Sequence, residues 1–255
     1  MRFALLGSGS EGNALLVQSG TTCLLMDCGF ALSDTQARLA RLGLTVDCIN
    51  GIVVTHEHGD HISGVVRLAS KFSIPVWLTH GTLRSKVNHL AALPDLTEIS
   101  PHHCFSIGDL LIQPYAVPHD AEEPVQYVFS DGARRLGVLT DTGCSTPHIE
   151  MMLSGSDALV LECNHDADLL ANSDYPYHLK QRIGGRMGHL SNADAAALLA
   201  RLRTDRLQHI VAAHLSRNNN LPELAVRALS EVLNCSDDWI AVASQSEGTD
   251  WRTIQ

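Results

Sequence analysis

The sequence predicts an α/β protein in which two β-sheets pack face to face and helices cover both outer surfaces, a four-layer αββα sandwich. Short apolar runs bounded by glycine- and serine-rich turns begin each half of the chain, as strands do. Apolar residues at three- and four-residue spacing follow in both halves, as in amphipathic helices. No proline-rich or low-complexity linker separates the halves, so we expect one domain over residues 1–255.

The expected strands are apolar runs of about four to eight residues. They cover residues 2–6, 14–18, 23–26, 51–55, 76–79, 110–117, 125–130, 136–140, 158–161, 209–213 and 240–243. Amphipathic helices are expected over residues 32–42, 62–72, 193–203 and 221–233. Asn192 precedes the third of these helices and is its expected N-cap.

The first turn needs separate treatment, because Gly7, Gly9 and Gly12 match the Gly-x-Gly-x-x-Gly pattern of dinucleotide-binding sites. That pattern requires a helix directly after the glycines, so that the pyrophosphate meets the helix N-terminus. Residues 14–18 are instead an apolar run typical of a strand. We therefore interpret the glycines as a turn between two strands and expect no nucleotide site there.

The composition is that of a globular enzyme. Apolar residues make up 45% of the chain and charged residues 18%, and the formal charge of −10 gives no overall sign of nucleic-acid binding. The seven cysteines are odd in number and form no Cys-x-x-Cys pair, which indicates reduced thiols. The apolar start turns glycine-rich too early for a signal peptide, and no run of about 18 apolar residues could span a membrane. We therefore expect a cytoplasmic protein.

Four metal-capable residues, His56, His58, Asp60 and His61, follow directly on the apolar run at 51–55. Two histidines two positions apart can converge on one ion, and the aspartate and the last histidine then point to a neighbouring ion. Imidazole and carboxylate groups suit Zn²⁺, Mn²⁺ or Fe, so the pattern predicts two divalent ions. The alternative is a polar surface loop that is rich in histidine by chance.

Three further candidates, His119, Asp141 and His214, stand at the carboxyl ends of apolar runs. One such residue alone is more often a satisfied polar group at a strand end than a metal ligand. Their shared position favours the ligand interpretation, because strand ends of this kind can gather at one edge of the sheets. We expect these residues to join the first cluster.

Together these residues resemble the metallo-β-lactamase superfamily, and residues 25–29, Leu-Met-Asp-Cys-Gly, match its first aspartate motif. The resemblance covers nearly the whole chain and implies the αββα fold. It implies that Asp27 is structural and orients the metal loop. The implied ligands of one ion are His56, His58, His119 and Asp141. The implied ligands of the other are Asp60, His61, Asp141 and His214, with Asp141 bridging the two.

Four segments in order resemble one branch of the superfamily, the bacterial YycJ (WalJ) type of DNA exonuclease. They are residues 6–13, 161–166, 188–192 and 214–220. We find no segment for the signal peptide of a secreted β-lactamase, the inserted cap of other nucleases or the arm of tRNA 3′-processing enzymes. The resemblance implies a phosphodiesterase that trims DNA from 5′ to 3′ with a metal-bound hydroxide.

Glu162 and His189 match a glutamate and a histidine that cooperate in related phosphodiesterases, where the histidine protonates the leaving group. The resemblance therefore implies that Asp60, Glu162 and His189 are catalytic, with Glu162 orienting His189. Such an acid is needed because an alkoxide is a poor leaving group at neutral pH. The alternative is that His189 caps the helix expected after Asn192.

Other polar segments allow two interpretations each. Residues 180–206 carry six lysines and arginines against two aspartates, and they either track a DNA backbone or form a solvated helix face. Asn218, Asn219 and Asn220 either donate to a phosphate or form a turn. His165 is either a ligand or a group behind one.

Three hypotheses for the function follow. The first is a dinuclear phosphodiesterase with DNA as its substrate. The second is a small-molecule hydrolase for a cyclic phosphodiester, thioester or lactone, favoured by the acidic charge and by the lack of a recognisable nucleic-acid module. The third, a non-catalytic binding protein, is disfavoured because every ligand position is filled. The choice between Zn²⁺ and Mn²⁺, the oligomeric state and protein partners stay open.

Overall fold

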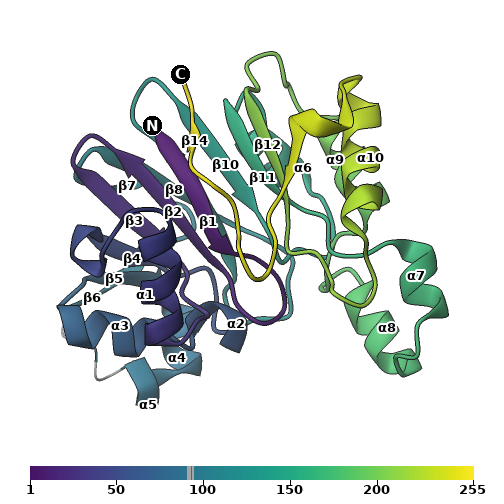
Figure 1. Cartoon of the computed structure of the whole chain (residues 1–255). Coiled ribbons are helices and arrows are strands. Elements are labelled where there is room, and N and C mark those ends of the chain that lie inside the picture. The colour runs from purple at the N-terminus through teal and green to yellow at the C-terminus, as the bar shows by residue number, and fades with distance from the viewer. Residues whose placement is uncertain (91–92, 94) are drawn as a thin grey trace.

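The computed structural model describes residues 1–90, 93 and 95–255, and within them two seven-stranded sheets pack face to face (Figure 1). The first sheet has the strand order β14-β1-β2-β3-β4-β5-β6, and the second has the order β13-β12-β11-β10-β9-β8-β7. Helices α1 and α3 lie against the outer face of the first sheet, and α9 and α10 lie against that of the second. The αββα sandwich predicted from the sequence is confirmed.

The elements have the following bounds. The first sheet contains β1 (Arg2–Gly7), β2 (Ala14–Ser19), β3 (Thr22–Met26), β4 (Gly51–Val53), β5 (Val76–Thr79), β6 (Leu96–Ile99) and β14 (Arg252–Thr253). The second contains β7 (Phe105–Ile107), β8 (Leu110–Ala116), β9 (Val125–Ser130), β10 (Arg135–Leu139), β11 (Ala158–Glu162), β12 (His209–Ala213) and β13 (Ile240–Val242). The helices are α1 (Leu32–Arg41), α2 (Gly59–Ile62), α3 (Val65–Phe72), α4 (His80–Ser85), α5 (Val87–Leu90), α6 (Pro147–Leu153), α7 (Ala167–Asn172), α8 (Tyr177–Ile183), α9 (Asn192–Leu199) and α10 (Pro222–Leu233), with 3-10 turns η1 (Val46–Cys48) and η2 (Asp237–Trp239).

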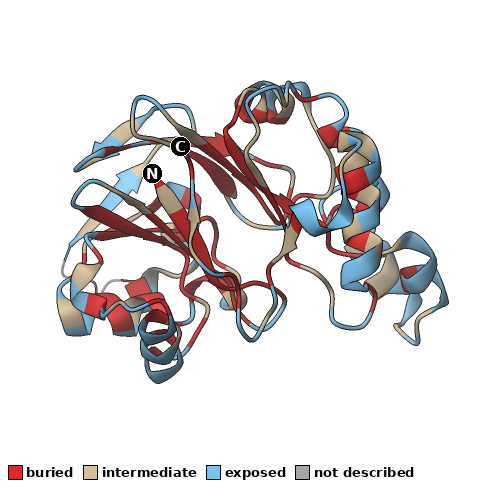
Figure 2. Cartoon of the chain, turned by 45° about the horizontal axis from the view of Figure 1, so that its top comes forward, coloured by how far each residue is buried: buried red, intermediate tan, exposed pale blue. Residues whose placement is uncertain are grey.

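The central strands of each sheet are buried on both faces, and successive side chains along a strand point to opposite faces. In β1, Phe3 and Leu5 point into the layer between the sheets, whereas Ala4 and Leu6 point into the layer under the helices. Figure 2 shows buried residues along both sheets. Each fully buried large apolar side chain stabilises the fold by roughly 1.5–3 kcal/mol.

The covering helices bury one stripe of residues each. In α1 the buried residues are Leu32, Thr35 and Leu39, and in α10 they include Ala225 and Leu229. These spacings of three and four residues are the ones that predicted both helices.

Two of the expected helices differ in the structure. The helix expected over 62–72 begins only at Val65, as α3, because Ile62 ends the separate short helix α2. Between the two helices the chain packs so closely on a neighbouring loop that a Cβ at Gly64 would lie 2.0 Å from the Phe30 carbonyl oxygen. The N-cap of α9 is Ser191, whose hydroxyl accepts a hydrogen bond from the Asp194 N–H. The expectation for Asn192 was therefore wrong, and its side chain pairs with that of Asn220 instead.

The fold places one end of many strands at a common edge. Strands β3, β4, β5 and β6 run parallel to one another, and so do β10, β11, β12 and β13. The carboxyl ends of β4, β8, β10 and β12 lie toward the bottom of Figure 1, between α2 and α8. No helix in the described part of the chain is long and apolar enough to cross a membrane.

Candidate metal centre

The four-residue cluster found in the sequence lies directly after β4, where the chain turns into α2. Asp27 anchors this loop, because its carboxylate accepts hydrogen bonds from the Thr55 N–H and the Thr55 hydroxyl, each at 2.8 Å. The same carboxylate lies 2.8 Å from Nδ1 of His61. The ring of His61 is thereby held with Nε2 turned toward Asp60 and Asp141, 3.3 Å from each.

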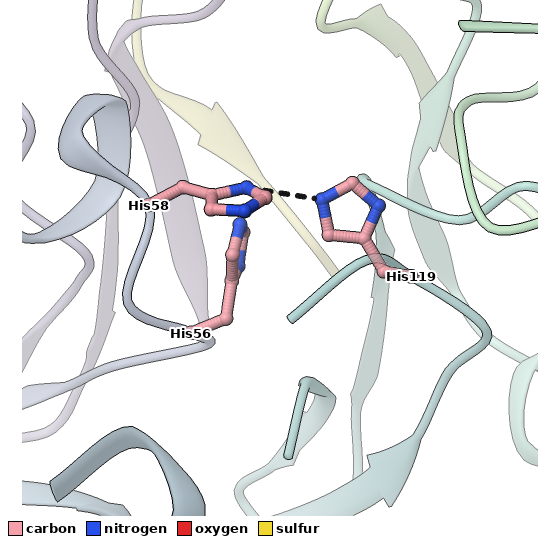
Figure 3. A group of neighbouring side chains, drawn as sticks. All are labelled: His56, His58 and His119. Atoms are coloured by element: carbon pink, nitrogen blue, oxygen red, sulfur yellow. Dashed lines mark hydrogen bonds between the residues drawn. The ribbon is translucent and has the colours of Figure 1, made fainter. Parts of the chain in front are cut away.

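His56, His58 and His119 form the first group of donors, and Figure 3 shows their rings turned toward one another. Nδ1 of His58 lies 3.2 Å from Nε2 of His119. The ring centroid of His56 lies 4.6 Å from that of His58 and 5.0 Å from that of His119. One nitrogen from each ring lies within 4.8 Å of the others, so the three can converge on one ion.

Asp60, His61, Asp141 and His214 form the second group. Nε2 of His214 lies 3.5 Å from Asp60 Oδ2 and 3.3 Å from Asp141 Oδ1. Asp141 Oδ1 also lies 4.0 Å from Nε2 of His119, so this carboxylate stands between the two groups. The structure thus brings all seven predicted ligands together at the sheet edge.

Three residues of the centre have an uncommon backbone conformation. Asp27, Asp141 and His214 have positive φ angles of 61°, 51° and 56°, each of which costs about 1–3 kcal/mol for a residue with a side chain. Fixed contacts hold two of them in place: Glu162 accepts from the Asp141 N–H at 3.0 Å, and the Ser8 hydroxyl accepts from the His214 N–H at 2.8 Å. Such strain is typical of functional sites.

The donor atoms fit a divalent cation better than they fit one another. His56 Nε2, Asp141 Oδ2 and His214 Nε2 are buried and have no hydrogen-bond partner among the described residues. A buried polar atom without a partner costs roughly 1–3 kcal/mol, and cations among these donors would remove that cost. Imidazole and carboxylate donors together suit Zn²⁺, Mn²⁺ or Fe.

Protons supply part of the missing positive charge in the metal-free protein. Burial alone would lower the pKa of His214, but Asp141, Asp60 and Glu162 raise it to about 9. Burial would also lower the pKa of His61, but that pKa is raised well above its usual value by the neighbouring carboxylates of Asp141, Asp27 and Asp60. Burial and the neighbouring His61 lower the pKa of His56, so that ring stays neutral.

We expect the apparent affinity of the centre for Mn²⁺ to rise with pH up to about 9, because the ion must displace the proton on His214. Each displaced proton changes the affinity by about tenfold per pH unit below that pKa. Titrations in chelator-buffered Mn²⁺ at several pH values measure the slope, which His214→Ala should flatten. An affinity that stays constant from pH 6 to 8 (a range of about two units) would contradict the assignment of His214 as a ligand.

Glu162 and His189 lie beside Asp141. Glu162 is fully buried, and its Oε2 accepts from the N–H groups of Thr142 and Leu190 at 3.1 Å and 3.0 Å. Its Oε1, which accepts from the Asp141 N–H, also lies 2.8 Å from Nδ1 of His189. Burial would lower the pKa of His189, but Glu162 and Asp141 raise it. Glu162 therefore positions His189, and the capping role for His189 was wrong because Ser191 is the N-cap of α9.

A cavity of about 300 Å³ opens over the donors, and His189 is part of its lining. At its rim the Arg182 Nε donates to Asp120 Oδ2 at 2.6 Å. The expected metal donors, the His189 imidazole and the Arg182 guanidinium therefore lie around one cavity.

Two residues of the centre were not expected from the sequence. They are Ser8, whose hydroxyl accepts from the His214 N–H, and Asn13. The side-chain amide nitrogen of Asn13 lies 3.2 Å from Asp60 Oδ2 and 3.2 Å from His61 Nε2. Both residues lie in the glycine-rich turn between β1 and β2, in which Gly9 has φ +145°. The turn interpretation was correct, but the two polar residues among the glycines were the signal of a further role.

Other candidates lie outside the two donor groups. His165 and Asn218 belong to neither group, and the Asn218 amide donates to the Tyr175 hydroxyl at 2.8 Å. Asn219 and Asn220 are buried, and Asn220 donates to the Cys163 carbonyl oxygen at 2.7 Å, which favours the turn interpretation.

The basic stretch at 180–206 does not form one face. Arg182 lies at the cavity rim, whereas Arg206 binds Asp157 near the amino end of β11, opposite to the end that carries Glu162. Arg201 binds Glu150 of α6. Only the first part of this stretch therefore lies beside the metal centre.

Comparison with known proteins agrees with this geometry. A family model described as "Beta-lactamase superfamily domain" matches residues 22–210. The chain is 36% identical over 252 residues to exodeoxyribonuclease YycJ of Bacillus anthracis, covering 98% of this chain and 96% of the relative. It is 32% identical over 247 residues to exodeoxyribonuclease WalJ of Streptococcus pneumoniae, covering 94% and 91%. The crystal structure of the metallo-β-lactamase fold protein YhfI of Bacillus subtilis shares the fold, with a TM-score of 0.76 and 17% identity over 98% of both chains.

Proposed function

The chain belongs to the metallo-β-lactamase superfamily, in the branch of YycJ and WalJ, and from that premise we propose that it is a dinuclear metal-dependent phosphodiesterase that trims DNA. Both of these relatives, which the chain covers almost completely, are named exodeoxyribonucleases. The proposal includes Zn²⁺ or Mn²⁺ as the two ions and trimming from 5′ to 3′. It also includes a cytoplasmic location, which the seven free cysteines support.

The observation that carries the proposal is the placement of His189 beside the shared carboxylate of Asp141. Nδ1 of His189 is held by Glu162 at 2.8 Å, which leaves Nε2 to hold a proton at the cavity. The leaving oxygen of a phosphodiester needs such a proton at neutral pH. Divalent ions held by the two donor groups would neutralise phosphate charge and lower the pKa of a water.

The residues divide the work in this scheme. His56, His58 and His119 would hold one ion, Asp60, His61 and His214 would hold the other, and Asp141 would contact both. Asp60 also binds the Asn13 amide, so its orientation is set by the turn after β1. Glu162 keeps His189 and the backbone of Asp141 in a fixed relation, since one carboxylate holds both.

Arg182 supplies the first quantitative test of a DNA substrate. Its side chain is 61% exposed and its Nε donates to Asp120, so its charge is held at the cavity rim where a phosphate would enter. We expect Arg182→Gln to weaken DNA binding and to reduce the slope of log affinity against log salt by about 0.7–0.9. Fluorescence anisotropy over a range of salt concentrations measures both effects.

Arg201→Gln is the matched control. Arg201 is 48% exposed and its Nε also donates to a carboxylate, Glu150 at 2.7 Å, but it lies outside the cavity lining. The control should leave affinity and salt slope as they are. Equal effects of both substitutions would show that the Arg182 charge has no special relation to the substrate.

A small-molecule hydrolase is the second candidate, and the volume of the cavity favours it. About 300 Å³ accommodates a cyclic nucleotide, a lactone or a thioester as well as the end of a strand. The formal charge of −10 also favours a substrate without a long polyanionic backbone.

One assay separates the two candidates. The protein is supplied with Zn²⁺ or Mn²⁺ and given DNA labelled at either end, single-stranded and duplex, with a 5′-phosphate. A cyclic nucleotide, a lactone and a thioester are tested in parallel. We expect nucleotides to be released stepwise from the 5′ end. Turnover of a small molecule with all DNA left intact would replace the proposal by the second candidate.

A further inference from the structure

We propose that a hollow on the far side of α8 binds an unpaired nucleobase of the substrate strand, with Tyr177 as the surface on which the base stacks. This inference rests on the proposed function and adds the part of DNA that is recognised. The hollow has a volume of about 900 Å³ and lies between α7, α8 and the start of α9. Its lining includes Leu170, Tyr177, Lys180, Gln181 and His165.

Helix α8 is the wall that this hollow shares with the metal cavity. Leu179, Arg182 and Ile183 line the metal cavity, whereas Tyr177, Lys180 and Gln181 line the hollow. None of the residues of α8 is buried, and Figure 1 shows α7 and α8 standing away from the sheets. A helix is about 10 Å across, a distance that a strand crosses within about two nucleotides. A strand with its phosphodiester in the metal cavity can therefore place a neighbouring base in the hollow.

Tyr177 has the exposure and the rigidity of a stacking surface. Its side chain is 74% exposed, the highest value among the exposed large apolar residues of the described chain. Its hydroxyl accepts a hydrogen bond from the Gln181 side-chain amide at 2.7 Å, one helical turn away, which restrains the ring. An aromatic ring held in this way can stack on any base, because every base has a π-face.

His165 supplies a polar group at the base of the hollow. Its side chain is buried, and its Nδ1 lies 3.4 Å from the Asn164 side-chain oxygen. Its Nε2 lies close to Gly184, 3.9 Å from the position that a Cβ would occupy there. Because glycine has no side chain, this nitrogen stays within reach of a group in the hollow. A base edge offers the donors and acceptors that an imidazole nitrogen can bind.

The charges on α8 suit a strand that crosses the helix. Lys180 lines the hollow with its Nζ bound to the Ala171 carbonyl oxygen at 2.7 Å, and Arg182 lies at the rim of the other cavity. Both can interact with the backbone phosphates between the reacting bond and the stacked base. Asp194 also lines the hollow, but its carboxylate lies 2.6 Å from the Ser191 hydroxyl, which donates to it. Cationic side chains beside an aromatic stacking surface are typical of single-strand binding. The site therefore selects DNA with at least one unpaired base near the reacting phosphodiester.

The test measures binding of a hexanucleotide, fluorescein-labelled at its 3′ end and joined by phosphorothioate linkages that resist hydrolysis, to the protein loaded with Zn²⁺ or Mn²⁺. Six further oligonucleotides each lack the base at one position. We expect one of these abasic positions to weaken binding to the unaltered protein by about 10-fold, within the range found for stacking of one base. Tyr177→Ala should weaken binding of the intact oligonucleotide by a similar factor and abolish the effect of that abasic position, whereas Tyr177→Phe should retain it.

A second substitution tests the hollow without touching the aromatic ring. Gly184→Ala is expected to fold normally, because the added Cβ would meet neighbours at 3.5–3.9 Å, which is ordinary contact. It should nevertheless weaken binding of the intact oligonucleotide, since the methyl group covers Nε2 of His165. Met151→Ala is the control, because Met151 is also exposed, at 64%, and lies on α6 away from the hollow.

The outcomes distinguish this inference from the proposed function. If the abasic positions have the same effect on Tyr177→Ala as on the unaltered protein, or no effect on either, the base pocket is wrong even where DNA is hydrolysed. If base-dependent binding is found but no DNA is cleaved with Zn²⁺ or Mn²⁺, the pocket stands and the proposed nuclease activity is wrong.

Discussion

The Asp141→Asn variant is expected to lose at least one of two metal equivalents and nearly all hydrolytic activity. In the unaltered protein, Asp141 Oδ2 lies 3.3 Å from Nε2 of His61. Asp141 Oδ1 lies 3.3 Å from Nε2 of His214 and 4.0 Å from Nε2 of His119. A neutral amide in this place cannot balance the charge of two cations. We expect metal affinity to fall by more than about 100-fold, since even groups that only orient a ligand contribute about 10- to 100-fold.

Metal content after dialysis against a defined free concentration measures this effect. Asp238→Asn is the matched control, because it removes the same charge from an exposed carboxylate in η2. The backbone contact between the Asp141 N–H and Glu162 is kept in Asp141→Asn, so the variant should still fold. Two full equivalents and normal turnover in this variant would remove Asp141 from the ligand set and overturn the dinuclear centre.

The parts of the fold that the sequence predicted well are the strands that are buried on both faces. Strands β5, β9 and β12 have the expected bounds, and nearly all of their residues are buried. Continuous burial requires an uninterrupted apolar run, which is a strong signal. Helix α8 gave no such signal because none of its residues is buried, and the exposed strand β6 escaped notice for a similar reason.

In the candidate site, residues that are close in the sequence could be predicted, whereas contacts between distant segments could not. His56, His58, Asp60 and His61 lie within six positions of one another, so their spacing alone indicates a shared task. Asn13 binds Asp60 across 47 positions, and no pattern in the sequence joins the two. The two interpretations of the basic stretch could not be separated from the sequence, because helix α9 carries Arg201 and Arg206 away from Arg182, and their partners Glu150 and Asp157 are distant in the sequence.

His189→Ala is expected to separate protonation of the leaving group from metal binding. The variant should keep both ions, because the ring is held by Glu162 and lies outside the two groups assigned to them. Turnover of DNA should fall about 10²- to 10⁴-fold, the usual contribution of a positioned proton donor. Hydrolysis of a nitrophenyl phosphodiester should fall far less, because nitrophenolate leaves without a proton.

Two other results would change the role of His189. Asp141, Glu162, His189 and His214 also lie within 4.8 Å of one another, so a loss of metal in His189→Ala would make His189 a ligand. Equal losses on both substrates with both metals retained would mean that His189 positions the phosphate instead.

Glu162→Gln is expected to behave differently from His189→Ala, although both disturb the same pair. A residue that only orients His189, which is the role that the resemblance implies for Glu162, would give a milder loss than His189 itself. The structure shows that its carboxylate also accepts hydrogen bonds from the N–H groups of Asp141, Thr142 and Leu190. The amide NH₂ of glutamine must face at least one of these donors, and a buried donor left unpaired costs roughly 1–3 kcal/mol.

The unpaired donor would destabilise the backbone at Asp141, which sets the position of the Asp141 carboxylate in the metal centre. We therefore expect Glu162→Gln to lower the free energy of unfolding and the metal content, and to reduce turnover of DNA and of the nitrophenyl substrate alike. His189→Ala should instead keep its metal content and lose mainly DNA turnover. Chemical denaturation, metal analysis and the two-substrate assay measure these effects side by side. A Glu162→Gln protein with full metal content and a loss confined to DNA would limit Glu162 to orienting His189, because the Asp141 ligand would then keep its place without the carboxylate.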